Sequence, residues 1–331
     1  MSRLKFCVIG AGRIAGLLEA DSKREKPCTH IGAIQHNRDL ELVGLYDIDY
    51  MKMAATKQLF GLNEAVIFSN YTEMLREKRP DIIAIATPPE THLKILEDVI
   101  NLSPESVIIL EKPVSVNYVE AQSFYLRNQG RLRQVIINHE RRFSNNYIYV
   151  KKKIDSGFFG KLLSVSAKLF FGKNRSIDDI LLDDGTHMID IIRHLIDDDI
   201  FFETITGDDT TNYINFKTPK CIGVIEIGNG RDYLLFEIDL IFNKGRIWIG
   251  NGVLKEEKSV DSPYYEKKQS LMPVTTSALN ETGYFKNLYK HAFKLATKEN
   301  CKSLSSFEDG LAALKFINEV KKRKEYNHGQ K

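Results

Sequence analysis

The chain has 331 residues, of which 43% are hydrophobic and 27% charged, and its formal net charge is +3. This length provides for one large or two ordinary domains, and so small a charge does not favour binding to nucleic acid or to a membrane surface. There is no apolar run of the ~18 residues that a membrane span needs and no signal-peptide pattern. The four cysteines are scattered, which favours neither a disulfide framework nor a zinc site. We therefore expect a cytoplasmic protein without a bound metal.

The first motif is a glycine turn that follows an apolar stretch. Residues 4–9 are typical of a short buried strand, and Gly10 and Gly12 follow, with the small Ala15 three residues later. Residues 17–20 are compatible with a helix. This order of strand, glycine turn and helix suits the pyrophosphate of a dinucleotide, because backbone N–H groups can approach the phosphates. The alternative is an ordinary glycine turn in an α/β domain.

Asp47 follows the second predicted strand, residues 42–46, where NAD-binding domains hold the adenosine ribose. The separation from the glycines exceeds the usual ~20 residues. A polar insertion at residues 21–29, which contains a proline, accounts for the excess. Asp49 is an alternative ribose ligand, and Asp47 could instead cap the helix predicted at residues 50–60.

Strands and helices continue to alternate up to about residue 137. Helices are predicted at residues 30–38, 71–78, 92–100 and 117–128, and strands at 65–68, 81–86, 106–110 and 134–137. This alternation predicts an α/β fold with a doubly wound parallel sheet, whose ligands bind at the carboxyl ends of the strands. The candidate residues at those ends are Gly10, Gly12, Asp47, Thr87, Pro88, His92, Glu111, Lys112 and Asn138.

The second part of the chain has the pattern of an α+β domain. Helices are predicted at residues 145–156, 179–196, 280–298 and 307–324, and strands at 161–171, 212–216, 221–227, 233–242 and 246–249. The segments 228–230 and 243–245 are typical of hairpin turns, and residues 261–276 are expected to form a loop. We predict a dinucleotide-binding domain at residues 1–135 and an α+β domain with a large, mostly antiparallel sheet at residues 136–331.

One face of this second sheet is expected to be apolar. The residues that would form it are Val224, Leu234, Phe236, Ile238 and Ile247. Such a face can pair with another subunit, or helices of the same chain can cover it, and the sequence leaves both interpretations open.

The sequence Glu111-Lys112-Pro113 places a lysine at the end of a predicted strand. At the mouth of a dinucleotide cleft, its ammonium can donate a hydrogen bond to a substrate oxygen and stabilise negative charge that develops there. The proline restricts the lysine backbone, and a cis bond between the two would aim the side chain. The alternative is a surface lysine at a helix N-terminus.

Asp183 and His187 are four residues apart in the helix predicted at residues 179–196 and would therefore share one face of it. A carboxylate beside an imidazole orients the ring and brings its pKa towards neutrality, which suits a general base. The alternative is a helix N-cap and a buried structural histidine. No H-E-x-x-H metal-binding pattern is present in the sequence.

Six stretches are similar to the motifs of one family. They are Val8 to Ala15, Ala86 to His92, Glu111 to Pro113, Arg142-Phe143, Leu182 to Asp190 and Phe307 to Ala312. Each is modest alone, but their order and spacing are specific. Over nearly its whole length the chain resembles the glucose–fructose oxidoreductase / inositol dehydrogenase (Gfo/Idh/MocA) oxidoreductases.

The resemblance implies a role for each matching residue. Lys112 would be the catalytic lysine, His187 the general acid/base, and Asp183 its partner and a substrate ligand. The NAD(P) site would be lined by Gly10, Gly12, Arg13, Ile14, Asp47, Thr87, Pro88, His92, Glu111 and Lys112. Asn138 and Arg142 would lie near the nicotinamide and the substrate. The C-terminal sheet would join subunits into dimers or tetramers.

The resulting hypothesis is an NAD-dependent dehydrogenase that oxidises a secondary alcohol of a sugar, cyclic polyol or nucleotide sugar. The Asp47 carboxylate would disfavour NADP, because it repels a 2′-phosphate. Two alternatives stay open: a family member that uses NAD transiently for glycosidic cleavage or epimerisation, and a non-catalytic dinucleotide-sensing regulator. The insertion at residues 21–29 departs from the family pattern and would either lean over the active site or form an inert surface loop.

Overall fold

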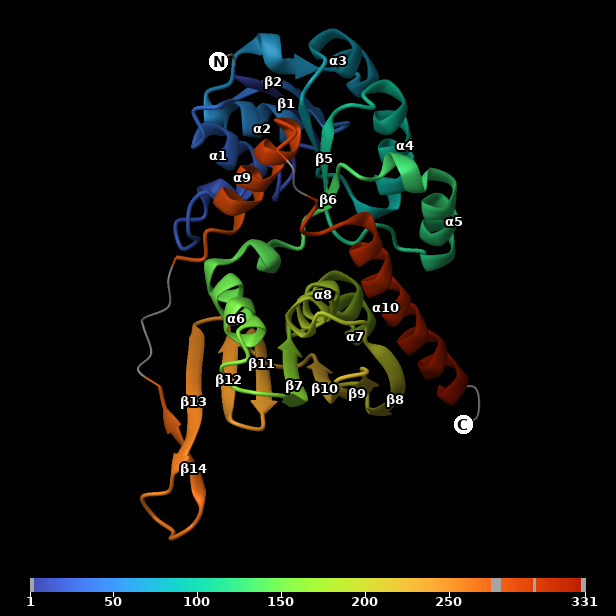
Figure 1. The fold of residues 1–331 in the computed structure, drawn as a ribbon. Helices are drawn as coiled ribbons and strands as arrows, with labels where there is room; N and C mark the ends of the chain where they lie inside the picture. The colour runs from blue at the N-terminus through green and yellow to red at the C-terminus, as the bar shows by residue number, and fades with distance from the viewer. Residues whose placement is uncertain (1–2, 275–280, 300–301, 329–331) are drawn as a thin grey trace. The chain divides into compact units, whose positions relative to one another are not determined.

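The computed structural model describes residues 3–274, 281–299 and 302–328 (Figure 1). The chain divides into two compact units, each built from two stretches of sequence. Unit 1 comprises residues 1–143 and 283–311, and unit 2 comprises residues 144–282 and 312–331. The first boundary therefore lies at 143/144 instead of the predicted 135/136, and residues 283–311 return to unit 1.

Unit 1 contains a six-stranded sheet in the order β3-β2-β1-β4-β5-β6, and all its strand pairs are parallel. The strands are β1 (Leu4–Ile9), β2 (Leu40–Tyr46), β3 (Ile67–Phe68), β4 (Ile82–Ile85), β5 (Val107–Leu110) and β6 (Val135–Ile137). The prediction of a doubly wound parallel sheet is confirmed. Because the strand order reverses between β1 and β4, the carboxyl ends of these two strands border the crevice in which such sheets bind ligands.

Helices and short 3-10 helices connect the strands of unit 1. The helices are α1 (His30–Gln35), α2 (Tyr50–Phe60), α3 (Tyr71–Lys78), α4 (His92–Leu102), α5 (Tyr118–Asn128) and α9 (Tyr284–Ala296). The 3-10 helices are η1 (Leu17–Ala20), η2 (Glu64–Val66), η3 (Pro89–Thr91), η4 (Gln129–Arg131) and η5 (Glu140–Phe143). Asn70 and Asn117 begin α3 and α5 by accepting backbone N–H groups of the first turn, as N-cap residues do.

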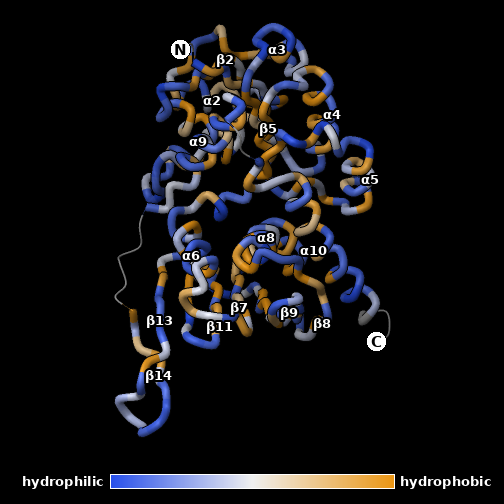
Figure 2. The backbone as a smooth tube through the Cα atoms, in the orientation of Figure 1, coloured by the Kyte–Doolittle hydropathy of each residue, from blue (hydrophilic) through white to orange (hydrophobic). Residues whose placement is uncertain are grey.

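The core of unit 1 lies on both faces of its sheet. β4 and β5 are completely buried, which explains their continuous apolar sequences. On one face, Phe6 of β1 stacks against Tyr289 of α9 with 5.2 Å between the ring centroids. This contact, far apart in sequence, is one reason why α9 belongs to unit 1. Figure 2 shows the hydrophobic stretches of the inner strands among more hydrophilic outer segments.

The helix expected directly after the glycine turn is interrupted. Leu17–Ala20 is a 3-10 helix, not an α-helix, and α1 begins only at His30. The backbone N–H groups of His30 and Ile31 donate to the carbonyl oxygens of Ile14 and Ala15, at 3.2 and 2.9 Å. Because α1 is thereby stacked on the first turn after the glycines, the intervening residues are an insertion into one helix.

Unit 2 contains an eight-stranded sheet in the order β14-β13-β12-β11-β7-β10-β9-β8. The strands are β7 (Leu162–Phe170), β8 (Phe201–Gly207), β9 (Thr211–Lys217), β10 (Ile222–Gly228), β11 (Leu235–Phe242), β12 (Gly245–Gly250), β13 (Val253–Asp261) and β14 (Gln269–Pro273). Only β7 and β10 pair in parallel; the other pairs are antiparallel. The prediction of a large, mostly antiparallel sheet is confirmed.

Three details of this sheet differ from the predictions. β7 lies between β10 and β11, so the turn at residues 228–230 does not join neighbouring strands. β8 was not among the predicted strands. β13 and β14 form a hairpin through the segment 261–273, where a loop was expected; the rest of that predicted loop includes residues outside the described ones. The turn at residues 243–245 does join β11 to β12, as predicted.

Four helices belong wholly or mainly to unit 2: α6 (Asn145–Asp155), α7 (Ile177–Asp183), α8 (Gly185–Ile196) and α10 (Phe307–His328). Phe236, Ile238 and Ile247 lie in the core that these helices share with one face of the sheet. Helices of the same chain therefore cover three of the five residues proposed for subunit pairing. Among the described residues, no helix is both long and apolar enough to span a membrane.

Candidate functional site

The glycine turn lies between the carboxyl ends of β1 and β4. Gly10 has a φ of +105°, and a Cβ there would lie 2.5 Å from the carbonyl oxygen of Ala86, so no larger residue fits. At Gly12, in contrast, a Cβ would meet no atom within 4 Å. The turn is therefore closed towards β4 at its first glycine and open at its second, as a pyrophosphate approaching the backbone would require.

Asp47 connects the end of β2 to this turn. One carboxylate oxygen accepts the N–H of Ala11 at 2.7 Å and the other accepts the N–H of Asp49 at 2.8 Å. Asp49 itself caps α2 by accepting the N–H groups of Met51 and Lys52. The capping role considered for Asp47 therefore belongs to Asp49, and Asp47 lies beside the glycine turn as a ribose ligand would.

The loop after β4 carries Thr87, Pro88 and His92. Thr87 is half-buried and Pro88 is exposed. His92 is completely buried, and its ring nitrogens lie 2.8 and 2.9 Å from the carbonyl oxygens of Pro113 and Thr87. Burial lowers the pKa of His92, although both carbonyl contacts oppose this shift. His92 therefore connects the loop after β4 with the loop after β5 and is itself inaccessible to solvent.

The Glu111-Lys112-Pro113 motif follows β5, and the Lys112–Pro113 peptide bond is cis. Glu111 is buried and accepts hydrogen bonds from His30, at 2.9 Å, and from Asn138, at 2.6 Å. Burial would raise the pKa of Glu111, but these hydrogen bonds and the charges of His30 and Lys112 lower it overall. Lys112 follows this fixed carboxylate and is half-buried at the strand end.

Asn138 and Glu140 follow β6, next to the motif. Asn138 is buried, and its Oδ1 has no hydrogen-bond partner among the described residues. Burial raises the pKa of the Glu140 carboxyl; the charge of Arg141 opposes that shift, Glu111 adds to it, and Lys112 and Arg24 also act on the group. Glu140 was not predicted as a site residue, yet it follows β6, the neighbour of the strand that leads into Lys112.

Arg142 is held inside unit 1. Its guanidinium forms an ion pair with Asp309 at 2.9 Å and donates to the carbonyl oxygen of Leu304 at 2.7 Å. One residue further on, a Cβ at Gly310 would lie 2.4 Å from a methyl group of Val114. The Glu-Asp-Gly motif at the start of α10 therefore fixes η5 and the segment after Pro113.

The insertion is attached to unit 1 at several points. Glu19 accepts hydrogen bonds from the Thr29 hydroxyl at 2.7 Å and the Cys28 N–H at 3.1 Å. Glu25 accepts the N–H of Gly283, just before α9, at 2.8 Å. These contacts tie the insertion to η1 and to the segment just before α9.

In unit 2 the helix predicted at residues 179–196 is divided into two between Asp183 and His187. α7 ends at Asp183 and α8 begins at Gly185, so the helix is broken between them. Arg175 spans the break, with ion pairs of 2.6 Å to Asp183 and 2.5 Å to Asp184. His187 is half-buried in the first turn of α8. Arg175 is thus one residue that holds the Asp183 carboxylate.

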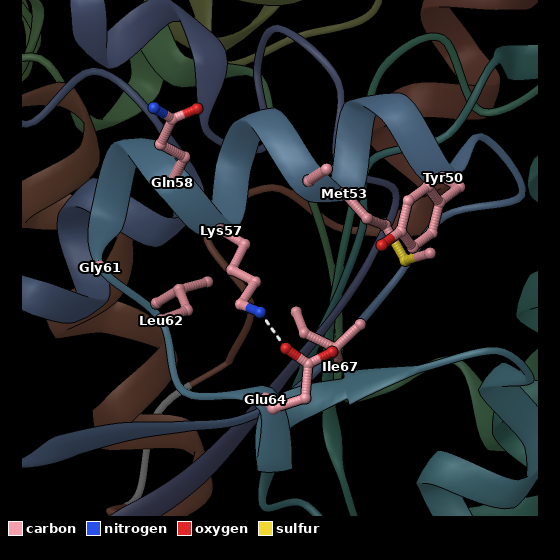
Figure 3. A pocket seen from close by; sticks show the side chains of 9 residues that line it. Tyr50, Met53, Lys57, Gln58, Gly61, Leu62, Glu64 and Ile67 are labelled. Carbon is pink, nitrogen blue, oxygen red and sulfur yellow. Dashed lines mark hydrogen bonds and ion pairs between the residues drawn. The ribbon is translucent and has the colours of Figure 1, made fainter.

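A pocket of about 510 Å³ lies elsewhere in unit 1, between α2 and the segment before β3 (Figure 3). Lys57 and Glu64 form an ion pair across it, and Leu62 and Ile67 supply apolar walls. None of the predicted site residues lines this pocket. Within the described ranges, no group of three or more side chains could hold a metal ion.

Unit 1 therefore brings together most of the predicted cofactor residues, at the carboxyl ends of its parallel strands. Asp183 and His187 lie in unit 2. Sequence reasoning missed His30, Tyr289 and Glu140. A histidine three residues after an insertion proline has no motif of its own, and the partners of Tyr289 are visible only in the fold.

The oxidoreductase family described as having an NAD-binding Rossmann fold matches residues 4–139. Inositol 2-dehydrogenase from Mycolicibacterium smegmatis is 26% identical over 208 residues, which are 60% of this chain and 55% of that protein. Its counterpart from Salmonella typhimurium is 24% identical over 204 residues, 59% of this chain and 55% of that protein. The matches span 26% to 55% of the length of these and other curated relatives.

Solved structures with a similar fold cover almost the whole chain. A dehydrogenase from Chromobacterium violaceum has a TM-score of 0.80 and 14% identity, covering 100% of this chain and 97% of that one. Myo-inositol dehydrogenase from Lactobacillus casei, in complex with NAD(H) and myo-inositol, has a TM-score of 0.74 and 18% identity, with coverage of 98% and 95%. At such low identity these likenesses concern the fold.

Proposed function

We propose that the chain is an NAD-dependent dehydrogenase of the Gfo/Idh/MocA oxidoreductases, because its residues 4–139 match the NAD-binding Rossmann domain of that family. Its substrate would be a secondary alcohol of a sugar, cyclic polyol or nucleotide sugar. The observation that carries the proposal is the position of Lys112. This lysine follows a buried, hydrogen-bonded carboxylate at the carboxyl end of β5, two strands from the open glycine turn.

The residues of unit 1 fit a dinucleotide. Gly12 leaves open space for the pyrophosphate, and Asp47 lies beside the turn for the adenosine ribose. Ile48, which is 92% exposed, offers an apolar surface for the adenine next to that carboxylate. Because a second negative charge beside Asp47 would be repelled, we propose NAD rather than NADP as the preferred cofactor.

Bound NAD would supply the acceptor for the hydride that leaves the alcohol carbon. Lys112 would donate a hydrogen bond to the substrate oxygen and stabilise its developing negative charge. His187 would accept the hydroxyl proton, and Asp183, oriented by Arg175, would hold the imidazole and a substrate hydroxyl. This proposal requires that Lys112 of unit 1 and His187 of unit 2 face the same nicotinamide ring.

Polyols and sugars are the substrate class that the site chemistry favours. The relatives named above are inositol dehydrogenases. A polyol carries several neighbouring hydroxyl groups, so a site that binds it needs both hydrogen-bond acceptors and donors. Glu140, after β6, would offer one acceptor, and Asp183 would offer a second. Arg142 would act on the substrate site by holding η5, since its guanidinium is engaged by Asp309 and Leu304.

We also propose that two copies of the chain associate through the second face of the unit 2 sheet. Side chains alternate along β11 and β12, so the residues between the core positions point to this other face. Ile222 of β10, offset from the core residues Ile225 and Ile227, is 65% exposed there. Arg246 forms an ion pair with Asp239, and Trp248 donates to Glu237 at 3.2 Å, so apolar and paired polar groups are mixed as at interfaces.

The test is incubation of the purified protein with NAD or NADP and a panel of cyclic polyols, sugars and nucleotide sugars. Absorbance of reduced nicotinamide that grows with time supports the dehydrogenase. Epimerised or cleaved product without net reduction would support the transient use of NAD instead. Dinucleotide binding with no conversion of any compound in the panel would support a sensor and overturn the proposal.

A further inference from the structure

Four buried side chains form one continuous hydrogen-bonded chain in unit 1. The Tyr289 hydroxyl lies 2.7 Å from Nδ1 of His30, and Nε2 of His30 lies 2.9 Å from Oε1 of Glu111. Nδ2 of Asn138 donates to the same Oε1 at 2.6 Å. Tyr289, His30 and Asn138 are at most 2% exposed and Glu111 is 6% exposed, so water does not compete for these contacts.

The chemistry of the carboxylate fixes the direction of the two hydrogen bonds at Glu111. An ionised carboxylate only accepts, so Nε2 of His30 and Nδ2 of Asn138 must both donate to Glu111. The other ring nitrogen of His30, Nδ1, shares a hydrogen bond with the Tyr289 hydroxyl. Glu111 is ionised because its hydrogen bonds and neighbouring charges lower its pKa, and burial raises the pKa of Tyr289 well above its usual value.

This arrangement decides which way the Asn138 amide points. Since Nδ2 is bound to Glu111, Oδ1 is directed to the opposite side of the amide. That oxygen is buried and accepts no hydrogen bond from any residue in the described part of the chain. A buried acceptor without a donor is a site that a ligand N–H or O–H group can satisfy. Asn138 follows β6, whose neighbour β5 leads into Lys112.

We propose that Tyr289 and His30 are positioning residues, which act through Glu111 to present Asn138 Oδ1 to the carboxamide N–H₂ of the nicotinamide ring. The inference rests on the proposed function, because it assumes a nicotinamide dinucleotide beside Lys112. It goes further by assigning two residues, from α1 and α9, to cofactor recognition. The carboxamide is the part of the reactive ring that offers hydrogen-bond donors, so its orientation decides which ring face receives hydride.

The test compares the dissociation constants of NAD and of 3-acetylpyridine adenine dinucleotide, measured by calorimetry without substrate. The analogue carries a methyl group where NAD has its amide nitrogen, and it cannot donate to Asn138. We expect the unmodified protein to prefer NAD by about tenfold, the equivalent of one ordinary hydrogen bond. Asn138→Ala should remove this preference, and Tyr289→Phe should reduce it while the affinity for the analogue stays unchanged.

Tyr125→Phe is the control, because it removes a hydrogen-bonded tyrosine hydroxyl elsewhere in unit 1, one that donates to Glu308 instead of to the His30 chain. It should leave the preference unaltered, and thermal unfolding should verify that each variant is folded. Equal affinities for NAD and the analogue in the unmodified protein would overturn the inference without any variant. An unchanged preference in Tyr289→Phe and Asn138→Ala would also overturn it, while dinucleotide binding would still support the proposed function. Absence of NAD binding would overturn the proposed function and, with it, this inference.

Discussion

Asp309 and Arg142 form a bidentate ion pair, at 2.9 and 3.1 Å, that holds the start of α10 against η5. The Asp309 carboxylate also accepts the N–H and hydroxyl of Ser306, so it caps the same helix. The Arg142 side chain is only 6% exposed. The Asp309 carboxylate therefore both caps the start of α10 and neutralises the buried Arg142 guanidinium. Arg142 lies in η5, shortly after Asn138 and the end of β6.

Replacement of Asp309 should destabilise the protein considerably. Asp309→Ala leaves the guanidinium of Arg142 buried without its counterion, which we expect to cost about 3 kcal/mol of unfolding free energy. Glu64→Ala removes a carboxylate from a surface ion pair and is the control, with an expected effect within about 0.5 kcal/mol. Urea denaturation measures both. Equal effects for the two variants would contradict the role assigned to Asp309.

Gly10 should tolerate no side chain. A Cβ at this position would lie 2.5 Å from a backbone oxygen, and the residue has a φ of +105°. We expect Gly10→Ala to lower stability by about 1–3 kcal/mol and to abolish dinucleotide binding. Gly130→Ala, where a Cβ meets nothing within 4 Å, should leave both unchanged. Thermal unfolding and NAD titration are the measurements, and normal NAD affinity in the first variant would refute the pyrophosphate assignment.

Lys112→Met should separate catalysis from cofactor binding. Loss of the ammonium removes the donor that stabilises the substrate oxygen, so turnover should fall by at least about 10²-fold. The dissociation constant for NAD should change little, because the proposed site holds the dinucleotide mainly through the glycine turn and Asp47. Lys94→Met, an exposed position on α4, is the control. Near-normal turnover of the Lys112 variant would exclude the lysine from the chemistry.

Asp47→Asn should weaken discrimination against NADP. The amide oxygen can still accept the Ala11 N–H, but the charge that repels a 2′-phosphate is gone. We expect the ratio of NADP to NAD affinity to rise about tenfold, or ~1.4 kcal/mol. Asp49→Asn removes a charge two residues away while keeping the helix cap, and should alter the ratio less. A larger effect for Asp49 would transfer the ribose role to that residue.

Acid should destabilise the protein through His291. Burial, with a smaller contribution from the Lys294 charge, lowers the pKa of His291 to about 4, and Nε2 accepts the Leu304 N–H at 3.1 Å. As the pH falls from about 6.5 to about 4, the unfolded chain binds a proton that the native imidazole refuses, so stability decreases by up to about 3 kcal/mol. His92, whose pKa is also lowered, acts in the same direction.

His291→Gln should flatten this dependence, because its amide oxygen can accept the Leu304 N–H at any pH. The measurement is the unfolding free energy in urea at about pH 7 and about pH 5 for both proteins. The variant should lose less stability than the unmodified chain between these two conditions. A parallel loss in both would assign the acid sensitivity to other groups.

Much of unit 1 could be predicted because its signals are local. Apolar runs, asparagine caps and glycines gave the strands, helices and turn, and the carboxyl ends of parallel strands necessarily lie on one edge of the sheet. The sequence did not indicate that Tyr289 would stack on Phe6, since such a contact depends on the path of the whole chain. For the same reason the return of residues 283–311 to unit 1 was missed.

In unit 2 the errors have two physical origins. The break at Asp184 was missed because residues 179–196 keep a helical pattern in the sequence. The ion pairs of Arg175 with Asp183 and Asp184, which span the break, depend on the folded structure. The order of the strands was wrong at residues 228–230 because a glycine turn indicates a change of direction but not which strand becomes the neighbour. β7, much earlier in the chain, occupies the place next to β10.

The way α1 stacks on the glycine turn has a consequence for how this chain could be altered. Because the N–H groups of His30 and Ile31 close onto Ile14 and Ala15, the two cut ends of the helix remain in register across the gap. The position of the sheet consequently does not depend on how many residues the insertion contains. Residues of the insertion other than the contacting Glu25, Cys28 and Thr29 can therefore be changed in number and type while the sheet underneath stays intact.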